Sequence, residues 1–413
     1  MKELYFTEKD LASRYEELCS MSWRLIEEES VDFKKWMAER YIEQKFAESL
    51  GAEKYERTEG RKGDRGGHYL RNLQLKTCRL KRLMIPRSTG HKWQNPLIEK
   101  FQRKSYEFES MVYYGFLYGH SCKDARKYLK EFHGEDVLSE QGVSDIFKKF
   151  SKEVDSWHKR EISGKYRFIF WDGKYVKVRG STKKKKAVLK VMGIRFDGRC
   201  EIIDFRVARS EAHLHWSGLA QSLYNRGLRC EETELFIIDG ASGLEETLNL
   251  IWPDIKRQNC KVHHIRNLAK RSKRINKGKI SKEAAKIYKA RTKEQAELRA
   301  VKFEAKWKIK EPKAVRIFMK GLEPTLTFYD FGWDKEYTKE DRQALWQVIS
   351  NTNYLERNIE EDVRRIKPMR CFRNNDSCDR VFYAKALEFN KNPWRFDLLA
   401  QKSQKRKSAE ILT

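Results

Sequence analysis

The chain has 413 residues, enough for two or three domains, and its Lys and Arg residues outnumber Asp and Glu by 88 to 60. A formal charge of +28 and an isoelectric point near 9.6 favour a polyanionic partner, most often nucleic acid, over a generically basic protein. Hydrophobic residues make up 39% of the chain, which excludes a disordered basic polypeptide.

Signals for membranes and secretion are missing from the sequence. No apolar run approaches the roughly 18 residues that a membrane-spanning helix needs, and the N-terminus has no apolar signal segment. The eight cysteines include no Cys-x-x-Cys pair, a pattern typical of reduced thiols. These features predict a cytoplasmic protein without a membrane-spanning segment.

Residues 1–90 are expected to form an N-terminal helical and basic region. Apolar residues recur at helical spacing among charged ones through residues 1–50. Residues 69–86 alternate like strands and end in a turn signal at 85–90, which contains Pro and Gly.

Between these elements, residues 51–71 are rich in glycine and in cations, among them Arg61 and Arg65. A flexible basic loop of this kind could follow a phosphate backbone. A solvated linker has the same composition, so both interpretations stay open at this point.

Residues 91–163 are expected to form a helix-turn-helix-like DNA-binding region. Residues 119–134 and 139–154 resemble a helix, a turn and a second helix, with Ser121 and Ser144 as helix starts. The second helix carries the candidate DNA contacts Lys148, Lys149 and Lys152. Two short amphipathic helices joined by a turn occur in many α-helical proteins, so this pattern alone has low specificity.

Residues 164–264 are predicted to form the first part of an α/β core. Strand-like patterns occupy residues 167–180, 185–198, 199–209, 235–238 and 255–259. A helix that ends at Gly227 separates the third strand from the fourth, and a second helix follows the fourth strand. Three antiparallel strands continued by parallel ones are the order of a ribonuclease-H-like domain.

The remainder of the chain is expected to complete this core. Residues 265–345 are highly charged with helical spacing, and we predict that they interrupt the core as an all-helical insertion. Residues 346–395 would return to the core and carry its last helix, at 350–366. Residues 396–413 are polar and basic and are predicted to be a mobile tail.

Three carboxylates stand out in this order of elements. Asp172 lies in the first strand pattern, although Asp is depleted in strands. Asp239 directly follows the fourth strand, where α/β sheets bind ligands, but it could instead cap the next helix. Glu356 in the last helix is the third candidate, and Glu360, one turn further on, competes for that role.

Three carboxylates on two strand ends and a facing helix can bind two Mg²⁺ ions about 4 Å apart. Mg²⁺ prefers oxygen ligands and keeps positions open for water and phosphates, and we expect Mn²⁺ to substitute for it. We therefore predict that Asp172, Asp239 and Glu356 are the metal-binding and catalytic residues of an enzyme that breaks and joins phosphodiesters.

Other polar residues have different explanations. Asp197 is expected in a turn and Asp204 on the solvent-facing side of a strand. Cys260 and His263 have the spacing of half a zinc site, but no matching second pair lies nearby in the sequence. A structural or substrate-orienting role beside the active site is the preferred interpretation of this pair.

Several motifs in a fixed order resemble one known family. They are residues 238–244 around Asp239, residues 258–267 with Cys260 and His263, the helical run 211–228 with Trp216, and residues 352–365 with Glu356, Arg364 and Arg365. In these residues, and over nearly its whole length, the chain looks like the mutator-type (DDE) transposases of bacterial insertion sequences. Its first motif departs from the family, because Trp171-Asp172-Gly173 stands where a Leu-Asp-Ala type is usual.

The resemblance implies a ribonuclease-H-like catalytic core that an all-helical insertion interrupts between the second Asp and the Glu. It also implies N-terminal DNA-binding helices, a catalytic triad of Asp172, Asp239 and Glu356, and a homodimer on paired DNA ends. Cys260 and His263 would then lie near the active site. Trp216 stands where the family has a Trp near that site, although a buried aromatic residue would fill the position equally well. The candidate contacts to double-stranded DNA would be Arg61, Arg65, Lys148, Lys149, Lys152, Arg364 and Arg365.

The expected function is therefore that of a nucleoid-associated DNA transposase. It would bind the terminal inverted repeats of its element, cleave the DNA ends and transfer their 3′-hydroxyls to target DNA by two-metal phosphoryl transfer. Two alternatives stay open: a related nuclease without strand transfer, and a transposase-derived DNA-binding or repressor protein that no longer has catalytic activity.

Overall fold

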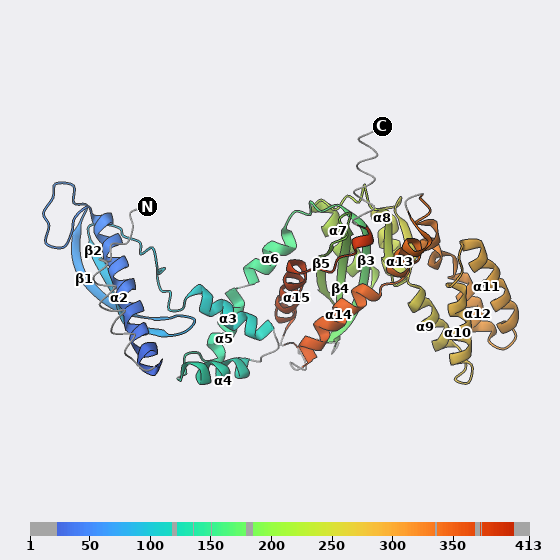
Figure 1. Ribbon diagram of the computed structural model, residues 1–413, viewed down its shortest axis with the longest axis horizontal. Coiled ribbons are helices and arrows are strands. Elements are labelled where there is room, and N and C mark those ends of the chain that lie inside the picture. Colours follow the sequence, from blue (N-terminus) through green and yellow to red (C-terminus); the bar gives the residue numbers. More distant parts are fainter. Residues whose placement is uncertain are drawn as a thin grey trace, which may run out of the picture. The chain divides into compact units, whose positions relative to one another are not determined.

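The computed structural model describes residues 23–117, 122–134, 136–149, 151–178, 185–334, 337–367, 372 and 374–399 (Figure 1). The chain divides into two compact units, residues 1–148 and 149–413, and each is considered by itself. The predictions for residues 1–22, for Ser121 and for the tail beyond residue 399 lie outside the described residues.

The first unit begins with a helix on a β-hairpin. Helix α2 (Trp23–Leu50) packs against β2 (Arg79–Thr89), which pairs antiparallel with β1 (Asp64–Gln74). Alternate residues of the two strands face the helix. The buried core of this part consists of Ile42, Leu73, Leu80, Leu83, Ile85 and Ile98.

The hairpin is longer than the sequence predicted. The glycine-rich segment 51–71 becomes strand at Asp64, so only its first part is loop. The predicted turn at 85–90 is wrong, because Pro86 lies within β2 opposite His68. A proline fits there because a two-stranded sheet has only edge strands.

Three helices follow the hairpin: α3 (Tyr106–Leu117), α4 (Cys122–His133) and α5 (Glu140–Lys149). The first helix of the predicted pair is confirmed as α4, but the second is divided, because α5 ends at Lys149 and Lys152 lies on the next helix, α6 (Ser151–Lys159). The helix start expected at Ser144 is wrong. It is Ser139 whose hydroxyl accepts a hydrogen bond of 3.0 Å from the Gly142 N–H and so begins α5.

A five-stranded mixed sheet organises the second unit. Its strands are β3 (Tyr166–Lys177), β4 (Lys185–Arg195), β5 (Cys200–Ala208), β6 (Leu235–Ile238) and β7 (Lys256–Asn259). Their order across the sheet is β5-β4-β3-β6-β7, with β5, β4 and β3 antiparallel and β3, β6 and β7 parallel. All four residues of β6 are buried, as expected for a parallel strand covered on both faces. The predicted order of strands and helices is confirmed.

Helices α7 (His213–Asn225) and α8 (Ser242–Ile251) cover one face of this sheet. Trp171, Trp216 and Leu244 belong to the apolar core between these helices and the strands. The predicted helix end is also confirmed, because Gly227 has a φ of +107° and ends α7 in a conformation that favours glycine.

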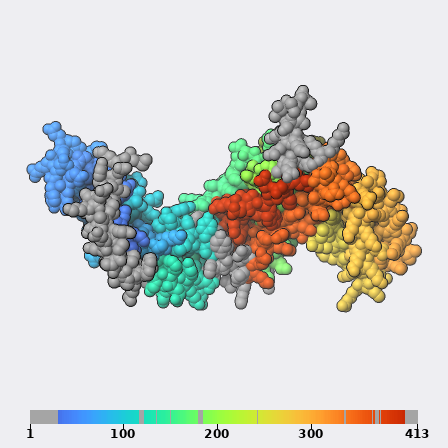
Figure 2. Space-filling view, viewed as in Figure 1, coloured from blue at the N-terminus to red at the C-terminus, as the bar shows by residue number. Residues whose placement is uncertain are grey.

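Helices α14 (Asn353–Ile366) and α15 (Asn375–Lys391) cover the opposite face. Helix α14 packs on β3 and β4, and α15 packs on β5; both lie on the viewed side of the second unit in Figure 2. The expectation that α14 is the last helix is therefore wrong, since α15 completes the layer.

Helix α6 (Ser151–Lys159) packs against α15 and so belongs to the second unit, although the sequence placed it in the DNA-binding region that ends at residue 163. His158 on α6 lies 2.7 Å from a carboxylate oxygen of Asp204, and Arg226 donates to the other. The prediction that Asp204 faces solvent is wrong, because these two residues enclose it and only 2% of it is exposed.

The described residues between β7 and α14 form helices joined by turns and loops, without a strand, in agreement with the helical pattern of residues 265–345. The helices are α9 (Lys261–Arg271), α10 (Lys277–Ile287), α11 (Lys293–Trp307), α12 (Pro312–Lys320), η1 (Glu323–Thr325), η2 (Thr327–Asp330) and α13 (Lys339–Ile349). The buried amide of Gln258 on β7 joins the insertion to the sheet. It donates to the Thr325 carbonyl at 2.8 Å and accepts from the Phe328 N–H at 2.7 Å.

The end of the described chain packs on the core. The Phe396 N–H donates to the Gly198 carbonyl at 2.9 Å, and the Phe396 ring lies 4.9 Å from that of Tyr354. Leu399 is buried. The tail predicted to begin at residue 396 is thus ordered by these contacts through residue 399. No helix in the described parts of the chain has both the length and the apolar character needed to cross a membrane.

Candidate active site

The topology of the sheet brings Asp172 and Asp239 to the same edge. Strands β3 and β6 are parallel neighbours, and their paired residues Trp171 and Ile238 directly precede the two aspartates. Strand β6 ends there, whereas β3 continues to Lys177, so Asp172 lies inside its strand and not at the strand end that the sequence suggested.

Main-chain N–H groups orient both carboxylates. One oxygen of Asp172 accepts a hydrogen bond of 2.8 Å from Gly173, and one oxygen of Asp239 accepts one of 2.9 Å from Ala241. The residue that caps α8 is Ala241, so the alternative that Asp239 is simply the cap of that helix does not hold.

Glu356 reaches the same edge from α14, and both of its oxygens are engaged. The Thr352 hydroxyl donates to one oxygen at 3.1 Å, and Arg266 of α9 donates to the other, also at 3.1 Å. An imidazole nitrogen of His263 lies 3.5 Å from the first oxygen. Glu360, the competing candidate, is instead exposed, with its carboxylate 3.7 Å from the Lys174 ammonium.

The two aspartates repel each other, with Asp172 buried and Asp239 half-buried. Burial raises the pKa of Asp172 well above its usual range, and the charges of Asp239 and Glu356 raise it further. Burial also raises the pKa of Asp239. Within the described part of the chain, no Lys or Arg forms an ion pair with either aspartate. Buried carboxylates of this kind fit a divalent cation with oxygen ligands.

Cys260 and His263 lie at the start of α9, where they connect this helix to α14. Cys260 is the N-cap of α9, and its sulfur accepts a hydrogen bond of 3.4 Å from the Thr352 N–H. The thiol of Cys260 raises the pKa of His263 to about 9 against the effect of burial, and the charges of Glu356 and Asp172 add to this effect. The pair therefore lies beside the carboxylates, as predicted.

Trp216, the third residue predicted near the site, is a core residue. Side chains alternate along a strand, so Trp171 points to the face opposite Asp172. Trp216 packs there, with its ring 6.3 Å from that of Trp171, and it is 1% exposed. It therefore supports β3 from behind and does not line the carboxylate edge.

Glu211 is a fourth carboxylate near the site, and the sequence indicated it only as the first residue of the motif at 211–228. It precedes α7, and its carboxylate lies over Gly173, where a β-carbon would come within 2.9 Å of it. Burial raises the pKa of Glu211, and the charge of Asp239 raises it further. Only the fold shows this proximity, because the glycine that makes room for Glu211 is next to Asp172 and far from Glu211 in sequence.

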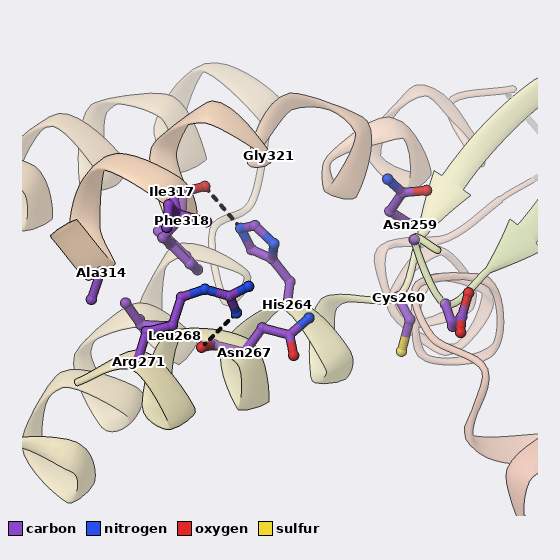
Figure 3. Close-up of a pocket in the computed structure, with 12 residues that line it drawn as sticks. Asn259, Cys260, His264, Asn267, Leu268, Arg271, Ala314, Ile317, Phe318 and Gly321 are labelled. Atoms are coloured by element: carbon purple, nitrogen blue, oxygen red, sulfur yellow. Dashed lines mark hydrogen bonds between the residues drawn. The ribbon is translucent and has the colours of Figure 1, made fainter. Parts of the chain in front are cut away.

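A pocket of about 180 Å³ extends from Asp239 into the insertion (Figure 3). Its core side is formed by Asp239, Gly240, Asn259 and Cys260, and its insertion side by residues of α9 and α12. The buried side-chain oxygen of Asn259 has no hydrogen-bond partner in the described structure.

On the insertion side of the pocket, His264 holds α9 against α12. One of its ring nitrogens lies 2.9 Å from the Phe318 carbonyl, and burial lowers its pKa to about 4. The neutral imidazole therefore donates this hydrogen bond, shown as a dashed line in Figure 3.

The residues predicted to contact DNA differ in their surroundings. In the first unit, Arg61 lies 3.1 Å from the Asp64 carboxylate, and Arg65 donates to Glu43 with most of its side chain buried. These two arginines stabilise the hairpin. Lys148, Lys149, Lys152 and Arg364 have exposed positions, whereas the side chain of Arg365 lies outside the described structure.

Comparison with known proteins identifies the family. Residues 7–395 match the Mutator family of transposases, so the chain belongs to this family, as predicted. It is 28% identical over 345 residues to the transposase for insertion sequence element IS905 of Lactococcus lactis, covering 83% of this chain and 84% of that protein. It is also 28% identical to the transposases for ISRM5 of Rhizobium meliloti (85% of each chain) and for IS256 in transposon Tn4001 of Staphylococcus aureus (84% of this chain, 87% of that protein).

Proposed function

We propose that the protein is an Mg²⁺-dependent DDE transposase with Asp172, Asp239 and Glu356 as its catalytic residues. The observation that carries this proposal is the convergence of the three carboxylates from β3, β6 and α14 on one edge of the sheet, where the charges of Asp239 and Glu356 raise the pKa of Asp172 and the charge of Glu356 raises that of Asp239. Membership of a transposase family supports the reaction class.

The proposal includes a ribonuclease-H-like catalytic core. Three antiparallel strands continued by two parallel ones, with helices on both faces, support this assignment. The helices from α9 to α13 would then be an insertion between the second and third catalytic carboxylates. The pocket beside Asp239 is consistent with an insertion that helps to enclose the DNA end.

Asp172, Asp239 and Glu356 would hold the metal ions through oxygen atoms, as Mg²⁺ and Mn²⁺ require. When bound, the ions would activate the attacking oxygen and stabilise the leaving oxygen of the phosphodiester. The fit rests on buried Asp172 and half-buried Asp239, neither of which forms an ion pair with a Lys or Arg side chain of the described residues.

The protein's own groups hold these carboxylates in place before DNA binds. Gly173 and Ala241 fix the aspartates through N–H groups, and Thr352 fixes Glu356. Arg266 is half exposed beside Glu356, so its guanidinium can also reach a DNA phosphate at this edge. Preorganised groups of this kind need little rearrangement when the substrate arrives.

The proposed partner is double-stranded DNA, and a net charge of +28 supports it. In this proposal α4 and α5 of the first unit recognise the terminal inverted repeats, and two copies of the protein pair the element ends. Such a protein would be nucleoid-associated when bound.

A strand-transfer assay with labelled element ends, a plasmid target and Mg²⁺ tests the proposal. Wild type should cleave and join the ends, whereas Glu356→Gln should bind them without joining. Glu360→Gln is the matched control, because this neighbouring carboxylate is exposed, and it should join like wild type. Loss of joining in Glu360→Gln with retention in Glu356→Gln would reverse the assignment of the third carboxylate.

The same assay separates the alternatives. Cleaved but unjoined ends would indicate a nuclease without strand transfer. Binding without cleavage in either Mg²⁺ or Mn²⁺ would indicate a DNA-binding protein that has lost catalysis.

A further inference from the structure

We propose that Cys260, His263 and Glu356 form a second cation site, selective for a thiophilic dication such as Zn²⁺ or Co²⁺. The sequence shows only two of these three residues close together. The third ligand comes from α14, which the fold places against the start of α9. Binding at this site does not depend on the proposed catalytic function; only its effect on DNA joining rests on that function.

The geometry of the three side chains carries the proposal. One ligand atom from each residue, a sulfur, an imidazole nitrogen and a carboxylate oxygen, lies within 4.8 Å of the other two. Around a tetrahedral Zn²⁺, with bonds of about 2.0–2.3 Å, such atoms would lie about 3.5 Å apart. His263 and Glu356 already have this separation, at 3.5 Å, so small side-chain rotations complete the site.

The surroundings of Cys260 favour its thiolate, the form that binds metal. Cys260 caps α9, and the N-terminus of a helix stabilises negative charge. Its sulfur also accepts the N–H of Thr352. Metal binding would displace the remaining thiol proton into solvent.

The ligand types separate this site from the one formed by the aspartates. Sulfur and imidazole select Zn²⁺ and Co²⁺, whereas Mg²⁺ binds oxygen. Cys260 is buried, but the side chains of His263 and Glu356 are 27% and 16% exposed, so an ion can enter from their side. Arg266 would leave Glu356, which it can do because half of its side chain is exposed.

Direct binding of Co²⁺ tests the proposal without DNA. The reduced, metal-free full-length protein is titrated with Co²⁺, and the thiolate-to-cobalt charge-transfer absorption is measured. We expect one equivalent to produce the band, and millimolar Mg²⁺ neither to produce nor to remove it. Cys260→Ser should abolish the band, and His263→Asn and Glu356→Gln should each weaken binding at least tenfold.

Cys78→Ser is the matched control, because this free cysteine lies in the other unit, and its band should equal that of wild type. Circular dichroism of each variant checks that it is folded. If Cys260→Ser is not folded, the absorption band of His263→Asn is compared with that of wild type instead. The proposal is overturned if the wild-type protein gives no band, or if the folded variant used for the comparison gives a band as strong as that of wild type.

Zn²⁺ should also inhibit DNA joining in Mg²⁺, because both ions require Glu356, and a zinc chelator should restore activity. The cobalt titration and the joining assay test two different proposals. If the cobalt band is normal but no joining occurs, only the proposed transposase activity is contradicted. If joining is normal but the band is absent, only the proposed Cys260–His263–Glu356 site is contradicted.

Discussion

Asp172 is a charged residue in the least favourable place for one. It lies in a strand, it is 4% exposed, and a second aspartate, Asp239, lies at the end of the neighbouring strand β6. Burying a carboxylate beside another without a cation costs free energy of folding. A pair of neighbouring carboxylates such as Asp172 and Asp239 is therefore expected where function requires it, although it lowers the stability of the folded protein.

This argument predicts that Asp172→Asn makes the metal-free protein more stable at neutral pH, by about 1 kcal/mol, while it abolishes joining. The pKa of Asp172 is raised in the folded state, so its favourable contribution exists at acid pH and is lost as the pH rises through that pKa. Thermal unfolding in chelator should therefore show a larger loss of stability from acid to neutral pH in wild type than in the variant.

Asp254→Asn is the control for this comparison, because Asp254 is exposed and should change neither stability nor joining. A lower melting temperature for Asp172→Asn than for wild type at neutral pH would contradict this prediction and show that the ionised Asp172 stabilises the fold. The hydrogen bond from Gly173 would then outweigh the burial and repulsion of the charge.

Glu211 gives a second prediction for a single residue. Its carboxylate lies beside the aspartates, and the charge of Asp239 raises its pKa, so it adds negative charge to the proposed metal site. Glu211→Gln should raise the Mg²⁺ concentration needed for half-maximal joining and lower the rate about 10–100-fold. A purely structural role would instead lower thermal stability and leave the Mg²⁺ dependence unchanged. Glu232→Gln, at an exposed carboxylate paired with Lys165, serves as the control.

The position of Glu356 depends on how helix α14 docks on the sheet. The ammonium of Lys190 on β4 is buried and donates to Asp362 at 2.6 Å and to Asn358 at 2.5 Å, both on α14. The Lys190 side chain thus joins α14, the helix that carries Glu356, to β4, the strand that pairs with β3 beside Asp172. Removing one partner of a buried ion pair leaves the other charge without compensation.

Lys190→Ala should therefore destabilise the protein by about 3–5 kcal/mol and reduce joining, because α14 loses its fixed register on the sheet. The double variant Lys190→Met with Asp362→Leu removes both charges and should recover most of the stability in urea unfolding. If the double variant is as unstable as Lys190→Ala, the packing volume and not the charge pair anchors this helix.

The strands of the core and helices α7 and α8 follow directly from the sequence because each has a local signal, whereas α15 was not predicted. The continuous apolar run of β6, the alternating strands before it and the glycine after α7 specify their structure with short-range information. The hairpin was predicted too short, because its glycine-rich first half resembles a loop until β2 pairs with it. Asp204 was predicted to face solvent because its contacts with His158 and Arg226 depend on the fold and have no signal in the neighbouring sequence.

The candidate site could also be predicted only in part. Asp172 and Asp239 could be selected from their positions on the strands, whereas Glu356 was distinguished from Glu360 by its family motif. The contacts that Glu356 makes with His263 and Arg266 could not be predicted, because they depend on how the insertion returns the chain to the sheet. Trp216 was assigned to the site by its motif alone, and only the alternation of side chains along β3 shows that it faces away.

At the scale of the whole molecule, the net charge of +28 divides into two populations of basic residues. Some cations stabilise the fold, such as Arg65, which is paired with Glu43 and stacks 5.1 Å from the Phe46 ring. Others, such as Lys152 on α6, extend into solvent. Only the second population can release counterions from DNA, so the total charge overstates the number of phosphate contacts.

The salt dependence of binding to a terminal-repeat duplex distinguishes these populations. Lys152→Gln should weaken binding and reduce the slope of log affinity against log salt by about 1, without a change in melting temperature. Arg65→Gln removes one positive charge as well, but it should lower the melting temperature and leave the slope unchanged, because its guanidinium is committed to Glu43. If the slope of log affinity against log salt falls equally in both variants, the Arg65–Glu43 ion pair must break when DNA binds, so that Arg65 contacts a phosphate. An unchanged slope for Lys152→Gln would exclude α6 from the DNA interface.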